Sequence, residues 1–105
     1  MPPPKARRSD TDKALIEAAE AALDLLYDQY FASTALDQLL LKPQIEQAAH
    51  GVLKARLLLL APGTIAVAAD LKEANRIKDA IGQAATAQDT VIAAARLITL
   101  LARFA

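Results

Sequence analysis

The sequence predicts an all-α protein, a small helical bundle of four main helices plus one short helix, with antiparallel neighbours joined by short loops. Leu, Ile and Ala recur at steps of three and four residues along most of the 105-residue chain, which is the spacing of one helix face. Proline is confined to the start of the chain and to the junctions between these runs. The chain has no Cys, so a disulfide framework cannot contribute to the fold.

The chain divides into a short arm and one domain. We expect residues 1–8 to form a flexible, basic, proline-rich arm, because three prolines oppose helix formation and no apolar side chain anchors it. Residues 9–105 then form a single bundle domain. Ser9 or Asp10 is the expected N-cap of the first helix, with acidic residues in its first turn and an end near Phe31. Its apolar stripe consists of Ile16, Ala19, Leu23, Leu26 and Tyr30.

A short helix and a long helix are expected next. Ser33 is a plausible cap for a short helix that carries three leucines, Leu36, Leu39 and Leu40. Lys42-Pro43 should end it, because the residue before a proline avoids helical angles. The third helix then runs from about Pro43 to Leu60, with the following residues facing inward: Ile45, Ala48, Ala49, Val52, Leu53, Leu57 and Leu60.

Two starts are possible for the helix after Pro62-Gly63. Thr64 could cap a helix that begins at Ile65. Alternatively, a capping box at residues 70–73 (Asp-Leu-Lys-Glu) starts the helix at Leu71 and leaves residues 64–69 extended. The continuous apolar stripe favours the early start.

The last two helix boundaries have clearer signals. Gly82 is expected to end the fourth long segment. Thr86 then offers an N-cap, and a final helix runs to the end of the chain. Its apolar positions are Val91, Ala94, Ala95, Ile98, Leu101 and Ala102.

Charge is segregated although the formal net charge is zero. Residues 1–8 carry +3, residues 9–41 carry −6 and residues 42–105 carry +3. A zero total argues against a dedicated nucleic-acid binder. Within the acidic block, one face of the first helix carries Lys13, Glu17, Glu20, Asp24 and Asp28. This acidic stripe is either a docking face for a basic partner or an ordinary solvated face.

A nucleic-acid interface is an alternative. Gln44, Gln47, His50 and Lys54 line one face of the expected third helix, and such side chains can contact bases and phosphates. The arm adds Lys5, Arg7 and Arg8. A short helix before this face would allow a helix-turn-helix arrangement, but the link is Lys42-Pro43 and the surroundings are not basic.

Signatures of catalysis and of metal or cofactor binding are missing. The chain has no thiol, and its two serines, Ser9 and Ser33, fall at expected helix caps. Its three glycines do not form a phosphate-binding loop or a dinucleotide fingerprint. Glu46 and His50 are four residues apart, but one His does not reproduce a bundle metal centre. We therefore expect no catalytic residue, no cofactor and no metal.

Four consecutive leucines, Leu57, Leu58, Leu59 and Leu60, span all sides of a helical turn, so a small bundle covers only part of them. We expect Leu58 or Leu59 to be left uncovered. The leading hypothesis is a non-catalytic interaction module that binds a protein partner or self-associates through apolar helix faces. Nucleic-acid binding and adsorption to a lipid or granule surface are the alternatives. The longest uncharged apolar run, residues 57–69, is too short for a transmembrane helix and no signal peptide is visible, so we expect a cytoplasmic protein.

Overall fold

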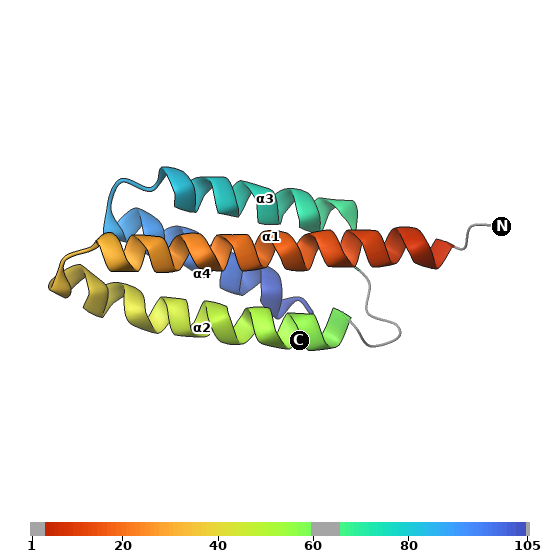
Figure 1. Cartoon of the computed structure of the whole chain (residues 1–105), viewed down its shortest axis with the longest axis horizontal. Coiled ribbons are helices and arrows are strands. Elements are labelled where there is room, and N and C mark those ends of the chain that lie inside the picture. The colour runs from red at the N-terminus through yellow and green to blue at the C-terminus, as the bar shows by residue number, and fades with distance from the viewer. Residues whose placement is uncertain (1–3, 60–65, 105) are drawn as a thin grey trace.

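Four helices make up most of the described part of the chain, which contains no strand (Figure 1). The computed structural model describes residues 4–59 and 66–104, and the side chains of residues 11–58 and 66–104. In chain order the helices are α1 (Pro4–Ala32), α2 (Ala35–Leu59), α3 (Ala68–Gln83) and α4 (Ala87–Ala102). The predicted all-α bundle is confirmed.

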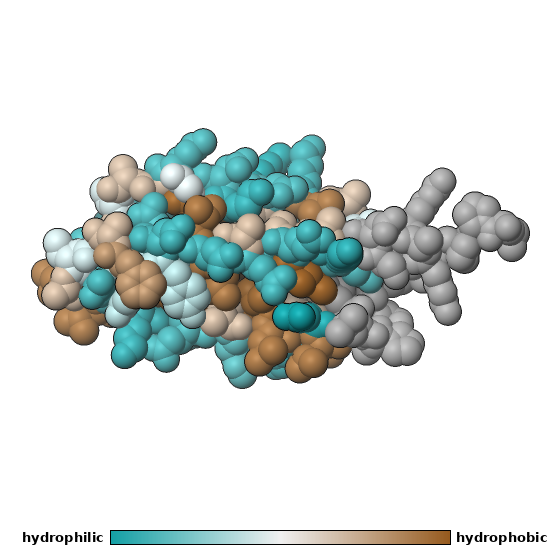
Figure 2. Space-filling view, viewed as in Figure 1, coloured by the Kyte–Doolittle hydropathy of each residue, from teal (hydrophilic) through white to brown (hydrophobic). Residues whose placement is uncertain are grey.

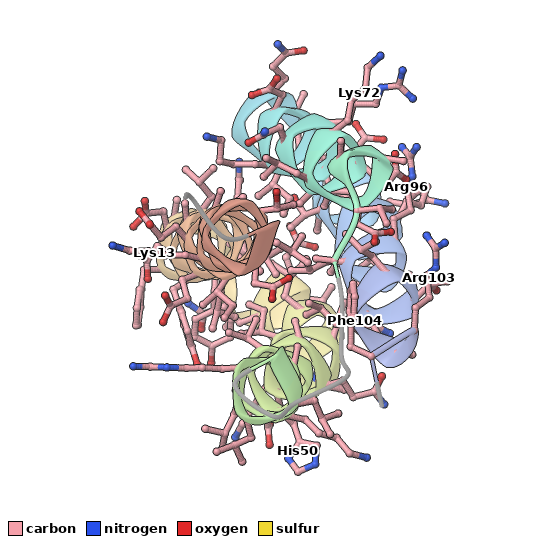
Figure 3. The ribbon with its side chains drawn as sticks, turned by 90° about the vertical axis from the view of Figure 1, so that its right-hand side faces the viewer. Lys13, His50, Lys72, Arg96, Arg103 and Phe104 are labelled. Carbon is pink, nitrogen blue, oxygen red and sulfur yellow. The ribbon has the colours of Figure 1, made fainter. Side chains whose placement is uncertain are left out.

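The helices form a ring in which α1 and α4 lie on opposite sides of the bundle axis. Each of these two helices packs against both α2 and α3, whereas α2 and α3 do not touch each other within the described residues. Figure 1 shows α3 above and α2 below, with α1 in front of α4, and the view along the bundle in Figure 3 agrees. In Figure 1, α1 and α3 run in one direction and α2 and α4 in the other. Every helix therefore keeps one face that points away from the bundle.

Helix α1 begins at Pro4, so the predicted start at Ser9 or Asp10 is wrong. Proline suits the first turn of a helix, because the missing N–H would have no intrahelical acceptor there and φ is already helical. Residues 4–8 of the expected arm thus have helical backbone. Asp12, which was expected near the helix start, accepts a hydrogen bond from the Ala66 N–H at 2.9 Å and ties the chain before α3 to α1.

Residues 35–59 form one helix, so the predicted separate short helix and its end at Lys42-Pro43 are wrong. An interior proline removes one backbone hydrogen bond, here the one to the Leu39 carbonyl, and usually bends or breaks a helix. Pro43 and Leu39 lie on the exposed side of α2, where water can hydrate that carbonyl. Leu41 and Ile45 are buried on the other side and hold both halves of α2 against the bundle.

The N-cap of α2 is Thr34, so the predicted cap at Ser33 is wrong. The Thr34 hydroxyl accepts a hydrogen bond from the Asp37 N–H at 3.2 Å, and its carbonyl accepts one from the Gln38 N–H at 2.9 Å. The Ser33 hydroxyl instead donates to the Gln29 carbonyl, 2.6 Å away in the last turn of α1. The two helices are therefore joined by a tight connection of two residues.

Helix α3 starts between the two predicted positions. Its N-cap is Val67 and its first residue is Ala68, so a start at either Ile65 or Leu71 is wrong; residues 64–65 themselves lie outside the described residues. Asp70 accepts a hydrogen bond from the Val67 N–H at 3.1 Å, which is half of a capping box, since valine has no side-chain oxygen to complete it. Asp70 was predicted to be the N-cap residue, but it occupies the third position of the helix and caps the Val67 N–H from there.

The boundaries around α4 follow the sequence signals closely. Helix α3 ends at Gln83, one residue beyond Gly82, the predicted stop. Thr86 is the N-cap of α4, as predicted, and its hydroxyl accepts a hydrogen bond from the Asp89 N–H at 3.1 Å. The helix continues to Ala102.

The core is built from a few large side chains and many alanines. The largest fully buried apolar side chains are Leu15, Leu26, Leu41, Ile77, Ile81 and Leu97. Small residues between them let the helices approach closely. At Gly51 of α2, an added Cβ would lie 3.4 Å from the Leu101 Cδ1 of α4, tighter than most real contacts of this kind. Gly51 therefore permits a close contact between α2 and α4 at this position.

Candidate protein-interaction surface

Apolar side chains gather on the face of α2 that points away from the bundle. We define the outer face of α2 by its exposed residues: Leu36, Leu39, Leu40, Pro43, Glu46, Gln47, His50, Leu53, Lys54 and Leu57. Its five leucines are exposed over more than half of their surface: Leu36 73%, Leu39 71%, Leu40 59%, Leu53 57% and Leu57 64%. Figure 2 shows apolar surface toward both ends of the lower edge, where α2 lies, with hydrophilic surface between them.

This face exists because α2 carries two apolar stripes on opposite sides. The inner stripe follows steps of four and three and consists of Leu41, Ile45, Ala48, Val52 and Ala55, all buried. The five exposed leucines lie about half a turn away. The prediction that Leu53 and Leu57 face inward is therefore wrong, because the stripe that includes Leu41 and Ile45 faces the bundle instead.

The four consecutive leucines are only partly described. Leu57 is exposed and Leu58 is half-buried, so of the two leucines predicted to be uncovered Leu58 is not fully exposed. The side chain of Leu59 and the whole of Leu60 lie outside the described residues. The expected exposure of Leu59 therefore stays a prediction, and the exposed leucine among the described residues of the run is Leu57.

The middle of the outer face is polar. Glu46, Gln47, His50 and Lys54 are all exposed there, and Figure 3 shows His50 pointing away from the bundle. Gln44, which was predicted to share this surface, is half-buried at its edge. The helix-turn-helix interpretation required two helices that meet at Lys42-Pro43, and it is wrong because α2 is continuous there. The side chains of Lys5, Arg7 and Arg8 lie outside the described part of α1.

The acidic stripe of α1 is exposed along its length. Glu17, Asp24 and Asp28 face solvent, and Figure 3 shows Lys13 on the outer side of α1. Glu20 is half-exposed and forms an ion pair of 3.5 Å with Arg56 of α2. Exposed pairs of this kind contribute about 0–1 kcal/mol. The exposure fits both a docking face and a solvated face.

A small groove of about 180 Å³ lies between α1 and α2, next to the outer face of α2. It is lined by Tyr27, Tyr30, Lys42, Ile45 and Glu46. Beyond it, Phe31 is 74% exposed and contacts Tyr30 edge to face, with ring centroids 5.4 Å apart. The sequence analysis did not identify this site. The sequence does contain a signal for it: three of the four aromatic residues of the chain lie close together just before the α1–α2 turn.

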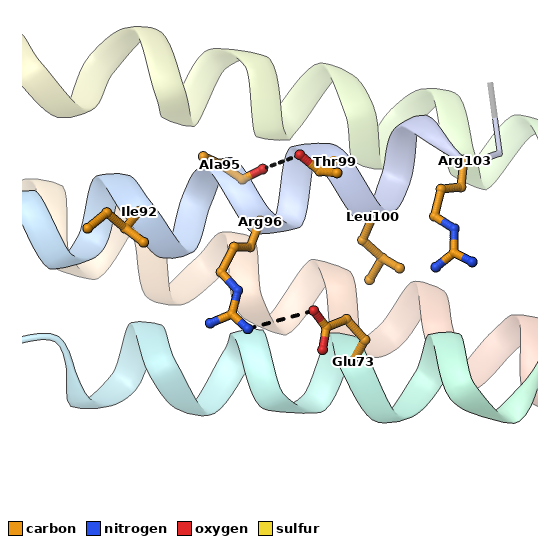
Figure 4. A pocket seen from close by; sticks show the side chains of 7 residues that line it. All are labelled: Glu73, Ile92, Ala95, Arg96, Thr99, Leu100 and Arg103. Carbon is orange, nitrogen blue, oxygen red and sulfur yellow. Dashed lines mark hydrogen bonds and ion pairs between the residues drawn. The ribbon is translucent and has the colours of Figure 1, made fainter.

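A larger groove of about 420 Å³ lies at the surface between α3 and α4 (Figure 4). Its polar side chains already have partners within the protein. Arg96 forms an ion pair of 3.9 Å with Glu73, and the Thr99 hydroxyl donates to the Ala95 carbonyl at 2.9 Å. The sequence analysis did not identify this groove either, because its walls come from two different helices.

Asp70 is the one carboxylate among the buried residues of the described chain. Its Oδ2 accepts the hydrogen bond from the Val67 N–H, and its Oδ1 lies 3.1 Å from the Nη1 of Arg103, an ion pair whose geometry does not form a hydrogen bond. The carboxylate also sits at the N-terminus of α3, where the helix dipole favours negative charge. Through these contacts Asp70 links the start of α3 to Arg103 at the end of α4.

In the described residues, His, Asp and Glu side chains nowhere form a group of three that could hold a metal ion. No helix in the same part of the chain is both long and apolar enough to cross a membrane. Comparisons with known protein families, curated proteins and solved structures give no match.

Proposed function

We propose that this chain is a non-catalytic helical interaction module that self-associates through the outer face of α2. The observation that carries the proposal is the exposure of five leucines on one face of one helix, by 57–73% each. Single exposed leucines are common on protein surfaces, but leucines that cluster at both ends of one helix face, as Leu36, Leu39 and Leu40 and then Leu53 and Leu57 do, mark an interaction site or an aggregation hazard. A cytoplasmic location is part of the proposal and is supported by a chain without Cys.

The strength of the association follows from the exposed area. Full burial of a leucine contributes about 1.5–3 kcal/mol, so the partly exposed leucines of two copies contribute on the order of 10 kcal/mol. The loss of translational and rotational freedom on association costs about 4–15 kcal/mol. Because these two quantities are similar, we expect a weak and reversible dimer.

The non-catalytic part of the proposal is supported by the two grooves. In the α3–α4 groove the charged and hydroxyl groups are engaged by neighbouring groups of the same chain. The α1–α2 groove offers two tyrosines, one lysine and one glutamate around an isoleucine, and tyrosine is enriched at protein–protein contact surfaces.

Sedimentation velocity over a concentration range up to about 500 μM tests the proposal, since weak dimers dissociate in the micromolar range or above. We expect the wild-type protein to sediment faster as its concentration rises. Leu39→Glu should abolish this increase, because it places a charge within the apolar face. Circular dichroism should show the same helical content for both proteins.

Ile92→Glu is the matched control, because Ile92 is an exposed aliphatic residue of α4, with 54% of its surface accessible, and lies outside the proposed interface. It should leave the concentration dependence unchanged. A wild-type protein that stays monomeric over the whole range, or an equal effect of both variants, would contradict the proposal. Flotation of the monomeric protein with lipid vesicles would favour the lipid-surface alternative.

A further inference from the structure

The outer face of α2 contains a seven-residue repeat. Leu36, Pro43, His50 and Leu57 are spaced by seven residues, and Leu39, Glu46 and Leu53 follow the same spacing three residues later. All seven residues are exposed. Alternating steps of three and four form the narrow seam through which two helices pack in a coiled coil. We refer to these seven residues as the α2 seam.

The α2 seam has a similar composition when read from either end. Leu36 and Leu39 lie at one end and Leu53 and Leu57 at the other, while the polar residues Glu46 and His50 lie between them. Such a pattern is complementary to a copy of itself that runs in the opposite direction, as a two-fold axis requires.

We propose that α2 packs in an antiparallel arrangement against α2 of a second copy, in one defined register. In this register Leu39 faces Leu57 of the second copy, Pro43 faces Leu53, and Glu46 faces His50. The proposal rests on the self-association proposed above and adds the direction and the register of the contact.

Charge and solvation select this register over its neighbours. A shift by one repeat in one direction places His50 against Leu39 of the second copy, and a shift in the other direction places Glu46 against Leu57. Both shifts bury a polar group against an aliphatic one, which is costly. A parallel pair would place Glu46 against Glu46, so that two like charges meet.

The selected register pairs polar groups with complementary ones. The Glu46 carboxylate can accept a hydrogen bond from the His50 imidazole of the second copy, and the two-fold axis creates this pair twice. At the edge of the seam, the aliphatic part of Lys54 can cover Leu40 of the second copy. Lys42 and Arg56 approach each other across the opposite edge, but Arg56 already has Glu20 as its partner at 3.5 Å. A polar layer within an apolar seam is a known means of fixing register.

The size of the seam agrees with a weak dimer. From Leu36 to Leu57 it extends over about 32 Å of helix, and a strip of this length buries on the order of 500 Å² per copy, below the about 800 Å² of a stable interface. The neighbouring exposed residues Phe31 and Tyr27 can add to this area.

A charge exchange tests the register without changing the leucines. Glu46→Lys places a lysine against His50 of the second copy, and His50→Glu places a glutamate against Glu46. Each variant alone should dimerise about tenfold more weakly than wild type, in sedimentation experiments, because like or unpaired groups meet twice in its dimer. An equimolar mixture should recover the wild-type affinity, because the mixed dimer pairs the introduced lysine with the introduced glutamate, and His50 with Glu46. A mixture that stays as weak as the separate variants would overturn the register.

Disulfide trapping gives a second, independent readout. The chain has no Cys, so introduced cysteines are its only thiols. In the double variant Leu39→Cys/Leu57→Cys, the two positions of one chain are about 27 Å apart along the helix, too far for an internal disulfide. Mild oxidation should give at least fivefold more covalent dimer than either single variant. Equal trapping by Leu39→Cys alone would indicate a parallel pair and overturn the proposal.

The outcomes separate the two proposals. A wild-type protein that dimerises, with neither recovery in the mixture nor trapping of the double variant, contradicts the register but leaves self-association intact. A wild-type protein that never dimerises contradicts both.

Discussion

Helices α2 and α4 lie side by side and are both rich in aliphatic residues, yet they use them differently. Helix α4 directs one stripe into the core, with Ala93, Ala94, Leu97, Leu100 and Leu101 buried, and Ile92 as its large exposed aliphatic residue. Helix α2 buries a stripe of similar composition, which consists of Leu41, Ile45, Ala48, Val52 and Ala55, and in addition leaves five leucines exposed on its opposite side. The comparison teaches that the size of an apolar side chain does not decide whether it is buried. The side of the helix on which the residue lies decides it: in α2 the stripe that includes Leu41 faces the bundle, and the stripe that includes Leu57 faces away from it.

The strongest test compares one leucine from each helix. Leu97→Ala in α4 should lower the free energy of unfolding by about 2–5 kcal/mol, because the fully buried side chain leaves a cavity. Leu53→Ala on α2, the same chemical change, should cost the monomer at most about 0.5 kcal/mol. Urea denaturation at low protein concentration measures both. Equal losses would contradict the assignment of Leu53 to an outer face.

The next test concerns the interior proline of α2, which α4 lacks. Pro43→Ala should raise the free energy of unfolding by about 1–3 kcal/mol, because alanine restores the hydrogen bond to the Leu39 carbonyl and is the better helix former. Urea denaturation measures this change, with circular dichroism to compare the helical content. A loss of stability would show that the proline itself supports the path of α2.

We expect the N-caps of α2 and α4 to contribute equally to the stability of the protein, although the two helices differ in the side chains that they expose. Thr86→Ala in α4 and Thr34→Ala in α2 each remove a hydroxyl that accepts one backbone hydrogen bond, at 3.1 and 3.2 Å. Each substitution should therefore cost about 1 kcal/mol in thermal or urea denaturation. A loss of stability for only one of the two variants would show that the starts of α2 and α4 do not contribute equally to stability.

The smallest expected effect concerns the ion pairs at the surface. Arg56→Ala in α2 removes the contact with Glu20, and Arg96→Ala in α4 removes the contact with Glu73. Both arginines are more than half exposed, at 58% and 53%, so each loss should be below about 1 kcal/mol and should disappear at high salt. Denaturation at low and high ionic strength checks this. A loss that persists at high salt would indicate that an arginine stem packs on the bundle.

The sequence predicted the start of α4 but not the complete buried face of either helix. In α4 the cap at Thr86 was correct, but the predicted stripe was displaced around the helix: Ala95 and Ala102 are exposed, whereas Leu97 and Leu100 are buried. In α2 the stripes at Leu41 and Leu57 lie on opposite sides, and periodicity does not say which one faces the bundle. Pro43 was predicted to end a helix on local grounds, and tertiary packing on both sides of it kept the helix continuous.

The sequence predicted that some leucines would stay uncovered, but not which ones. The run from Leu57 to Leu60 indicated more leucine than a small bundle can cover, yet Leu57, which was expected to face inward, is exposed, and Leu58 is half-buried. The exposure of Leu36 and Leu39 was not predicted, because the expected break at Pro43 placed them in a separate helix. The continuity of α2 aligns both ends into one face.

The sequence by itself determined the helical class, the absence of disulfides, the exposed acidic stripe of α1 and the cap at Thr86, because these depend on local spacing and on residue chemistry. Tertiary structure alone decided which stripe of α2 is buried, that α2 continues through Pro43, and that Asp70 meets Arg103. These features depend on the distances between helices far apart in the sequence, and no local pattern contains those distances.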